Sequence, residues 1–396
     1  MVFATLVDTA QAAGLPAPHW FIQFFKVLGF TLHAVPMNLW YAGLLLALCL
    51  HLGRNQHGRE FAARLIAQMP VIIAVGVNLG IVPLLFIQVA YFKFFYPDTI
   101  LMAWFWLGII VLLIPAYYGV YSYAWGLRKE KGSGPICRNG PEGAAHKLDL
   151  TPFPFWRHAA GWIAALMFIA IGFIFANGMS LMDHIDRWDE IWNKTNVAGA
   201  ALGTGLNIGD PTLWPRWLLM FGLALGTTAA WALADTVFFN RKAAEEYNRW
   251  IWKFAKIVYT LGLILAAAAG TWYVFGTWSA ELRKTMFSFP AILLTVLTAL
   301  APGLPWVMIV TEKRCPAKRP LVAGIALAQL GVLGINAVSR QVVQNVNIGM
   351  VFDVFSQKTD VQWGPMAMFL AALVIGLGIL AWMLAQVLKS SANSPG

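Results

Sequence analysis

Residues 68–92, QMPVIIAVGVNLGIVPLLFIQVAYF, decide the fold of this chain because they contain no Asp, Glu, Lys or Arg. An apolar run of about 20 residues is long enough to cross the hydrocarbon core of a bilayer as one helix. Similar runs recur along the 396 residues, of which 59% are hydrophobic and 12% are charged, and the mean hydropathy is +0.65. This composition excludes a soluble globular protein and predicts an all-α, polytopic transmembrane helical bundle.

Polar breaks between the apolar runs divide the chain into nine expected spans and two terminal segments. Residues 1–27 contain Asp8 and the helix-breaking stretch GLPAP at 14–18, so we expect an interfacial segment there. Residues 28–390 are expected to form one transmembrane domain, and residues 391–396 a short cytoplasmic tail. The nine spans are expected near residues 28–50, 68–92, 98–125, 159–181, 217–239, 254–278, 286–310, 320–339 and 364–388.

The distribution of Lys and Arg predicts the orientation, because basic loops are retained on the cytoplasmic side. With the N-terminus outside and the C-terminus inside, 19 of the 28 basic residues fall on the inner side. Basic loops that face anionic lipid headgroups also account for the net charge of +10 without a nucleic acid partner. The expected outer loop 183–212 is acidic, which suits either a basic partner or cation, or a loop that is simply solvated.

Few polar groups lie deep in the expected spans, where an ionisable side chain is costly to bury. Asp235 is a carboxylate near the inner end of the fifth span, within reach of Arg241 or Lys242. It is either a snorkelling ion pair or a proton or ion site. His33 lies inside the first span, and it suits either a ligand of heme b iron or a histidine that packs against a helix or faces a quinone.

Arg340 and Gln341 form a second polar group, at the outer end of the eighth span. Such side chains donate hydrogen bonds to a heme propionate, a quinone carbonyl or a lipid phosphate, and all three acceptors remain open. The three cysteines form no CxxC or CxxCH motif, and the chain has no P-loop. The sequence therefore predicts no disulfide framework, no cysteine-bound iron–sulfur cluster and no covalently attached heme.

Short motifs in this chain follow the order found in subunit I of the cytochrome bd quinol oxidases, and most of the chain resembles that family. Residues 33–39, HAVPMNL, are similar to its first-span His before Val-Pro, and residues 75–80, VGVNLG, to its second-span GVxxG. Residues 175–179, FANGM, resemble its fourth-span ANGW and add Asn177 to the candidates. Residues 339–341, SRQ, resemble its GRQ. The resemblance implies a multi-pass protein of the bacterial inner membrane, with quinone and heme b as cofactors.

The chain departs from that family at the residues that would bind heme. Leu219, Ile292 and Gln329 stand where the resemblance places a ligating His, Met and Glu. The third-span glutamates are replaced by apolar residues near Trp106 and Leu113, and the long quinol-binding loop is reduced to residues 276–286. An oxygen reductase is therefore not expected.

Two functions from different classes remain. In the first, the chain is the membrane subunit of a respiratory, quinone-linked oxidoreductase that exchanges electrons between the quinone pool and a periplasmic partner such as a c-type cytochrome. His33, Asn177, Arg340 and Gln341 would then bind the quinone, with His33 as the candidate heme ligand. In the second, it is a cofactor-free anchor or assembly subunit that contacts lipid and other membrane subunits.

Overall fold

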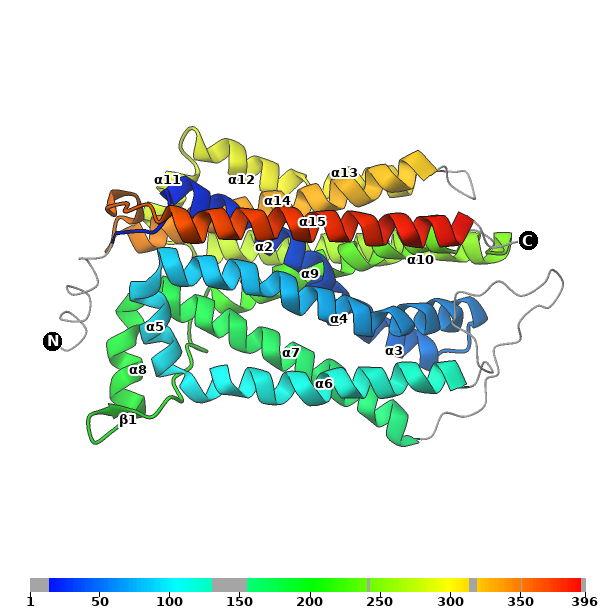
Figure 1. Cartoon of the computed structure of the whole chain (residues 1–396), viewed down its shortest axis with the longest axis horizontal. Helices are drawn as coiled ribbons and strands as arrows, with labels where there is room; N and C mark the ends of the chain where they lie inside the picture. Colours follow the sequence, from blue (N-terminus) through cyan, green and yellow to red (C-terminus); the bar gives the residue numbers. More distant parts are fainter. Residues whose placement is uncertain (1–13, 130–154, 241–242, 313–318, 350, 393–396) are drawn as a thin grey trace.

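The computed structural model describes residues 14–129, 155–240, 243–312, 319–349 and 351–392, which form an elongated bundle of helices running along its long axis (Figure 1). Eight helical segments are long and apolar enough to cross a membrane. A further helix, α15 (Trp363–Ala392), contains a shorter apolar part, Trp363–Ile379. The all-α, polytopic bundle is thereby confirmed, and the chain is a multi-pass membrane protein. The eight segments are His19–Leu52, Gln56–Ala90, Ala103–Leu127, Phe155–Asp183, Leu213–Phe239, Glu245–Thr277, Ala291–Thr311 and Arg319–Gly349.

The spanning segments of the described chain run back and forth along the bundle, and some of them consist of two or three consecutive helical elements (Figure 1). In chain order the elements are α2 (His19–Asn38), η1 (Leu39–Gly43), α3 (Leu44–Leu52), α4 (Gln56–Ala90), α5 (Phe92–Leu101), α6 (Ala103–Lys129), α7 (Phe155–Asp183), η2 (Ile185–Arg187), α8 (Trp188–Thr195), β1 (Asn196–Val197), β2 (Ala200–Ala201), α9 (Leu213–Ala234), η3 (Asp235–Phe239), α10 (Glu245–Thr271), η4 (Trp272–Thr277), α11 (Ala280–Met286), α12 (Ala291–Leu300), α13 (Gly303–Thr311), α14 (Arg319–Gly349), η5 (Val354–Ser356) and α15.

Residues 68–90 of the apolar run 68–92 form the C-terminal part of α4. Asn55 caps this helix by accepting a hydrogen bond from the amide of Gly58. Pro70 and Pro83 lie inside the helix without ending it. Proline is tolerated in membrane helices because neighbouring helices and local adjustments satisfy the backbone groups that it leaves free.

The ends of several spans differ from the sequence expectation. The first helix begins at His19 rather than near residue 28, so part of the segment expected to be interfacial is continuous with the first span. The third spanning helix begins at Ala103 rather than near residue 98, because the short helix α5 occupies the preceding residues. Residues 1–13, 130–154 and 393–396 lie outside the described part of the chain, and with them most of the expected inner loop and tail.

Small residues allow close helix packing in the middle of the bundle. A Cβ atom at Gly222 of α9 would lie 2.6 Å from the backbone nitrogen of Ala266 in α10, and one at Gly262 would lie 2.6 Å from the carbonyl oxygen of Gly222. A Cβ at Gly172 of α7 would lie 0.8 Å from the hydroxyl of Tyr41. Close backbone approach through small residues is the usual means of packing helices in lipid, where no hydrophobic effect drives them together.

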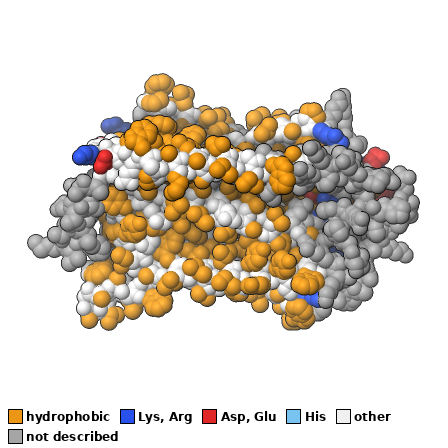
Figure 2. Space-filling view, viewed as in Figure 1, with side chains coloured by type: hydrophobic (Ala, Val, Ile, Leu, Met, Phe, Trp, Pro, Cys, Tyr) orange, Lys and Arg blue, Asp and Glu red, His pale blue; other side chains and the backbone are white. Residues whose placement is uncertain are grey.

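The surface between the two ends of the bundle is apolar. Figure 2 shows hydrophobic side chains over the middle of one face, with Lys, Arg, Asp and Glu near the two ends. Large apolar side chains of α6 are exposed, including Leu107, Ile110 and Val111, which is 68% exposed. A soluble protein does not expose such a surface, whereas a bilayer covers it.

One end of the bundle carries the shorter elements. In Figure 1, α5 and α8 run across the end at the left of the view, whereas α3 lies near the opposite end. We refer to these as the α5/α8 end and the α3 end. The sequence predicts that the α5/α8 end faces outside.

Candidate functional site

Polar side chains from five segments of the chain are buried together at the α5/α8 end. They come from α2, the α4–α5 junction, α7, α9 and α14, so the site is assembled only when the whole bundle has formed. We call this group the end cluster, and its members are Lys26, Tyr91, Asp183, Arg216, Arg340, Gln341, Gln344 and Asn345.

An ion pair stands at the centre of the end cluster. Nη1 of Arg216 donates to Oδ2 of Asp183 at 2.8 Å. The other carboxylate oxygen of Asp183 accepts from the side-chain amide of Gln344 at 3.0 Å. The oxygen of that amide in turn accepts from Nζ of Lys26 at 2.5 Å. Asp183 is therefore satisfied by two donors, and a chain of hydrogen bonds connects it to Lys26.

Tyr91 connects the other half of the end cluster. Its hydroxyl accepts from the side-chain amides of Gln23, at 2.8 Å, and Gln341, at 2.7 Å, and donates to the side-chain oxygen of Asn345. The ammonium of Lys26 lies over its ring, 4.2 Å from the centroid, in a cation–π contact. These contacts hold Gln341 and Asn345 of α14 in fixed positions.

Arg340 is the member of the end cluster whose donors are unused. Its guanidinium lies over the ring of Phe30, 4.3 Å from the centroid, and has no hydrogen-bond or ion-pair partner among the described residues. The positive charge of Arg216 repels the guanidinium of Arg340, and the negative charge of Asp183 attracts it. A guanidinium offers five donors in a rigid fork. The site thus presents an unsatisfied, planar donor group beside an ion pair that is already satisfied.

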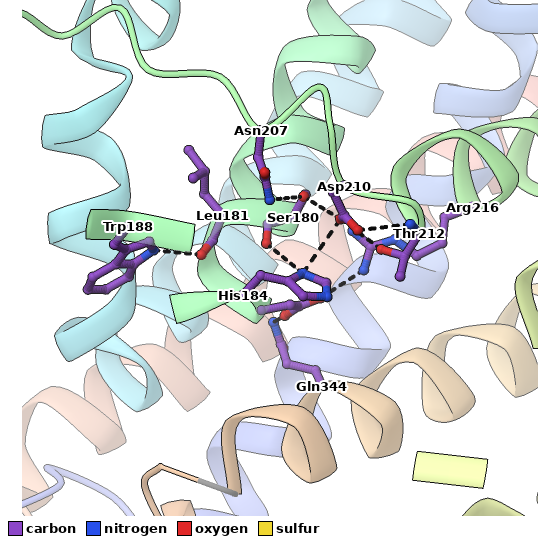
Figure 3. A network of polar contacts seen from close by, with 10 residues as sticks. Ser180, Leu181, His184, Trp188, Asn207, Asp210, Thr212, Arg216 and Gln344 are labelled. Carbon is purple, nitrogen blue, oxygen red and sulfur yellow. Dashed lines mark hydrogen bonds and ion pairs between the residues drawn. The ribbon is translucent and has the colours of Figure 1, made fainter. Parts of the chain in front are cut away.

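A second polar network adjoins the end cluster and connects the end of α7 with the loop before α9 (Figure 3). Oδ2 of Asp210 accepts from the hydroxyls of Ser180, at 2.5 Å, and Thr212, at 2.8 Å. Nδ1 of His184 lies 3.5 Å from the same oxygen. Asn207 donates to the hydroxyl of Ser180 at 2.9 Å. This network fixes the loop that follows α8 against the end of α7.

The four residues singled out from the sequence do not all belong to one group. Arg340 and Gln341 are members of the end cluster. Asn177 is buried in α7, where its amide nitrogen donates to the carbonyl of Phe173 and its oxygen has no partner in the described chain. His33 contacts α4 instead.

The surroundings of His33 are those of a packed side chain. Its Nδ1 is 2.8 Å from the carbonyl oxygen of Gly76. A Cβ atom at Gly80 would lie 2.8 Å from Cε1 of the imidazole, so the ring rests directly on the α4 backbone. Its other neighbour is Trp40, with ring centroids 5.7 Å apart. Among the described residues, no group of three or more His, Cys, Asp or Glu side chains could hold a metal ion.

Asp235 forms an ion pair with Arg64 of α4. Nε of Arg64 donates at 2.8 Å, Nη2 donates at 3.0 Å to the second oxygen, and Gln68 donates at 2.7 Å. The expected contact with Arg241 or Lys242 falls on residues outside the described part of the chain. Asp235 is 1% exposed, so the pair is a buried, bidentate one that joins α4 to η3, at the end of α9.

Gln329 lies in an uncharged network in the middle of the bundle. Its side-chain oxygen accepts from the hydroxyl of Tyr259 at 2.6 Å, and its nitrogen donates to Thr227 at 3.1 Å. Asn38 also donates to Thr227, at 2.9 Å. Leu219, which is partly buried, packs against the apolar cluster that contains Leu223 and Leu333. Hydrogen bonds and apolar contacts fill this part of the bundle.

Several members of the site were not identified from the sequence. Lys26 falls in the segment expected to be interfacial, and Asp183 and Arg216 fall in the expected outer loop or at its edge. The one local signal was Lys26 itself, a single charge between FIQFF and VLGF. Nothing local indicated that Tyr91 or Gln344 would meet it, because those contacts join residues far apart in the chain.

Fold and site together define a polytopic helical membrane protein with a buried polar cluster at one end. A scan against models of known families finds no match to this chain, and no curated protein matches it either.

Proposed function

We propose that this chain is the quinone-binding membrane subunit of an electron-transfer complex, and that Arg340 donates hydrogen bonds to a quinone oxygen at the α5/α8 end. One observation supports this proposal most directly. The guanidinium of Arg340 lies over Phe30, and its donors have no partner among the described residues. A quinone carbonyl is a planar acceptor on an apolar body, which suits a donor fork placed beside an aromatic ring.

The charge balance of the end cluster supports an electron-rich ligand. The cluster contains three basic side chains, Lys26, Arg216 and Arg340, and one carboxylate, Asp183. The carboxylate of Asp210, in the second network, also acts on Arg216, which leaves three basic side chains against two carboxylates. Excess positive charge is costly in a medium of low dielectric constant unless an acceptor is present. A quinone carbonyl gains electron density on reduction, so its interaction with these cations strengthens at that step.

His33 keeps the two roles that the sequence leaves open, packing and heme b ligation. Its Nδ1 is hydrogen-bonded to the carbonyl of Gly76, and a histidine that binds a metal through Nε2 commonly makes this second contact. The ring also rests on the backbone of α4 at Gly80, as a packed side chain does. Gln329 is occupied by Tyr259 and Thr227, and we expect the subunit not to reduce oxygen by itself.

The proposed periplasmic partner is a small basic redox protein such as a c-type cytochrome. Asp186 and Asp189 are exposed beside α8, at the end where the quinone would bind. Opposite charges steer the encounter of such proteins, and the attraction falls as the salt concentration rises. The location in a bacterial inner membrane belongs to this proposal.

Binding of a short-chain ubiquinone analogue to the purified chain in lipid nanodiscs tests the proposal. Arg340→Lys keeps the charge but removes the fork, and a hydrogen bond to a charged group contributes about 1.5–3 kcal/mol, so we expect binding to weaken about tenfold or more. Arg319→Lys is the matched control, because Arg319 is exposed at the other end of the same helix.

The alternative ligand of Arg340 is a lipid phosphate, as expected for a cofactor-free anchor. A lipid phosphate accepts from Lys as well as from Arg, with Lys acting as a point charge, so that function predicts that Arg340→Lys still assembles. Quinone binding that is equal in the wild type, Arg340→Lys and Arg319→Lys would refute the quinone site and favour the anchor.

A further inference from the structure

Asp98 of α5 is a buried carboxyl group without a partner. It is 0% exposed, and neither side-chain oxygen has a hydrogen-bond partner among the described residues. An ionised carboxylate in such a place loses its hydration and gains nothing in return, whereas a neutral carboxylic acid loses much less. The geometry alone therefore favours the protonated form.

The ring of Trp106 and the α7 backbone at Gly178 lie beside Asp98. A Cβ atom at Gly178 of α7 would lie 3.4 Å from Oδ2 of Asp98 and 3.1 Å from the ring of Trp106. The indole nitrogen of Trp106 is also buried without a partner in the described chain, as is the side-chain oxygen of Asn177, the residue before Gly178. This part of the bundle therefore leaves several buried polar atoms without protein partners.

The charges around Asp98 come mainly from α7. α5 packs on α4, α6 and α7, and its Phe94 also contacts Trp188 of α8 and Phe352. Of α4, α6 and α7, only α7 brings a charged residue of the described chain to this end, namely Asp183. The helix α8 carries Asp189, Glu190 and Lys194, and Asp353 follows Phe352. The charged residues of α4 and α6 belong to the first turns of α4 or the last turn of α6, near the α3 end: Arg59, Glu60, Arg64, Arg128 and Lys129. On α5 itself, Lys93 lies over Phe352.

Burial, followed by the negative charge of Asp183, raises the pKa of Asp98 well above its ordinary value. A carboxyl whose pKa is raised by folding stabilises the protein at low pH, and this contribution is lost as the pH rises through the folded-state pKa. Asp183 differs, because Arg216 and Gln344 satisfy it. Two neighbouring carboxyl groups with opposite environments are a common arrangement for holding and releasing one proton.

We propose that Asp98 is a proton-binding site at the α5/α8 end, neutral at pH 7, which holds its proton less tightly when the negative charge at Asp183 is removed. The site takes a proton and requires neither a metal nor a quinone. If the end cluster binds a quinone, Asp98 is placed to supply one of the two protons that join two electrons in forming the quinol; this extension rests on the proposed function.

Infrared spectroscopy of the purified chain in nanodiscs tests the proposal directly. We expect the carbonyl stretch of a protonated carboxylic acid at pH 7, shifted in D2O and lost in Asp98→Asn. The exposed residue Asp186 supplies the control, because Asp186→Asn should leave the band unchanged. Asp183→Asn removes the like charge and frees Arg216, so Asp98 should ionise at lower pH.

The pH titration of the wild-type band gives a second readout that does not depend on any variant folding. Loss of the band only above neutral pH supports the proposal. Spectra of the wild type and Asp98→Asn that are identical at pH 7, or a wild-type band that disappears below pH 5, would overturn it. No quinone is added in this experiment. A negative result for the proton site at Asp98 is therefore independent of whether the end cluster binds a quinone.

Discussion

At the scale of single residues, Arg216 and Arg340 show how neighbouring cations can have different roles. Arg216 is paired with Asp183, so its charge is balanced and its geometry fixed. Arg340 is held only by its contact with Phe30, so its donors stay available. A charge that is already paired is structural by default, whereas an ordered charge without a partner is a candidate for ligand binding.

The pair Asp235–Arg64 gives a prediction about stability. Asp235→Asn removes the buried carboxylate that accepts two hydrogen bonds from Arg64 and one from Gln68, and we expect the free energy of unfolding to fall by about 1.5–3 kcal/mol, the contribution of a hydrogen bond to a charged group. The double variant Asp235→Leu with Arg64→Met should recover much of that loss, because both charges are then removed. Unfolding in a denaturing detergent, followed by circular dichroism, measures both. A proton or ion site at Asp235 would instead give normal stability in Asp235→Asn.

The candidate site could be predicted from the sequence only in part. Arg340 and Gln341 were identified because polar residues at the end of an apolar run are conspicuous. Asp183 and Arg216 were not, because in sequence they belong to a polar loop, where charges are ordinary. His33 was placed near a quinone because depth in the span was known, whereas the helix face that it presents to α4 was not.

At the scale of helices, α9 and α10 depend on glycine at their crossing. Gly222→Leu inserts a side chain where a Cβ atom alone would lie 2.6 Å from the backbone of Ala266. We expect a loss of about 1–3 kcal/mol from overpacking. Gly331→Leu is the control, because a Cβ atom there meets no other atom within 4 Å. Equal unfolding midpoints for the two variants would contradict this close packing.

The helices themselves were largely predictable, because each apolar run of sufficient length becomes a helix in a bilayer. The errors lie at the ends, as at His19 and Ala103. Short helices such as α5 lie across the end of the bundle, and hydropathy alone does not separate them from the span that follows. The break between α12 and α13 falls at Ala301–Pro302, inside what hydropathy treats as one span.

At the scale of the whole molecule, the account requires one orientation. With 19 of the 28 basic residues expected on the inner side, the β1–β2 hairpin should lie outside and residue 138 inside. Alkaline phosphatase fused after Gly199 should be active, and the same reporter fused after Arg138 should be inactive. The opposite pattern would place the end cluster on the cytoplasmic side and remove the proposed periplasmic partner.

The central claim is that the end cluster binds a quinone through Arg340, and photo-crosslinking with an azido-quinone tests it most directly. The purified chain is illuminated with the probe, and labelled peptides are mapped by mass spectrometry. We predict labelling near Phe30 and near Arg340, prevented by excess unlabelled quinone and much reduced in Arg340→Lys. Labelling spread over the lipid-facing residues of α6 and α15, unaffected by competitor and by the Arg340 variant, would contradict the claim.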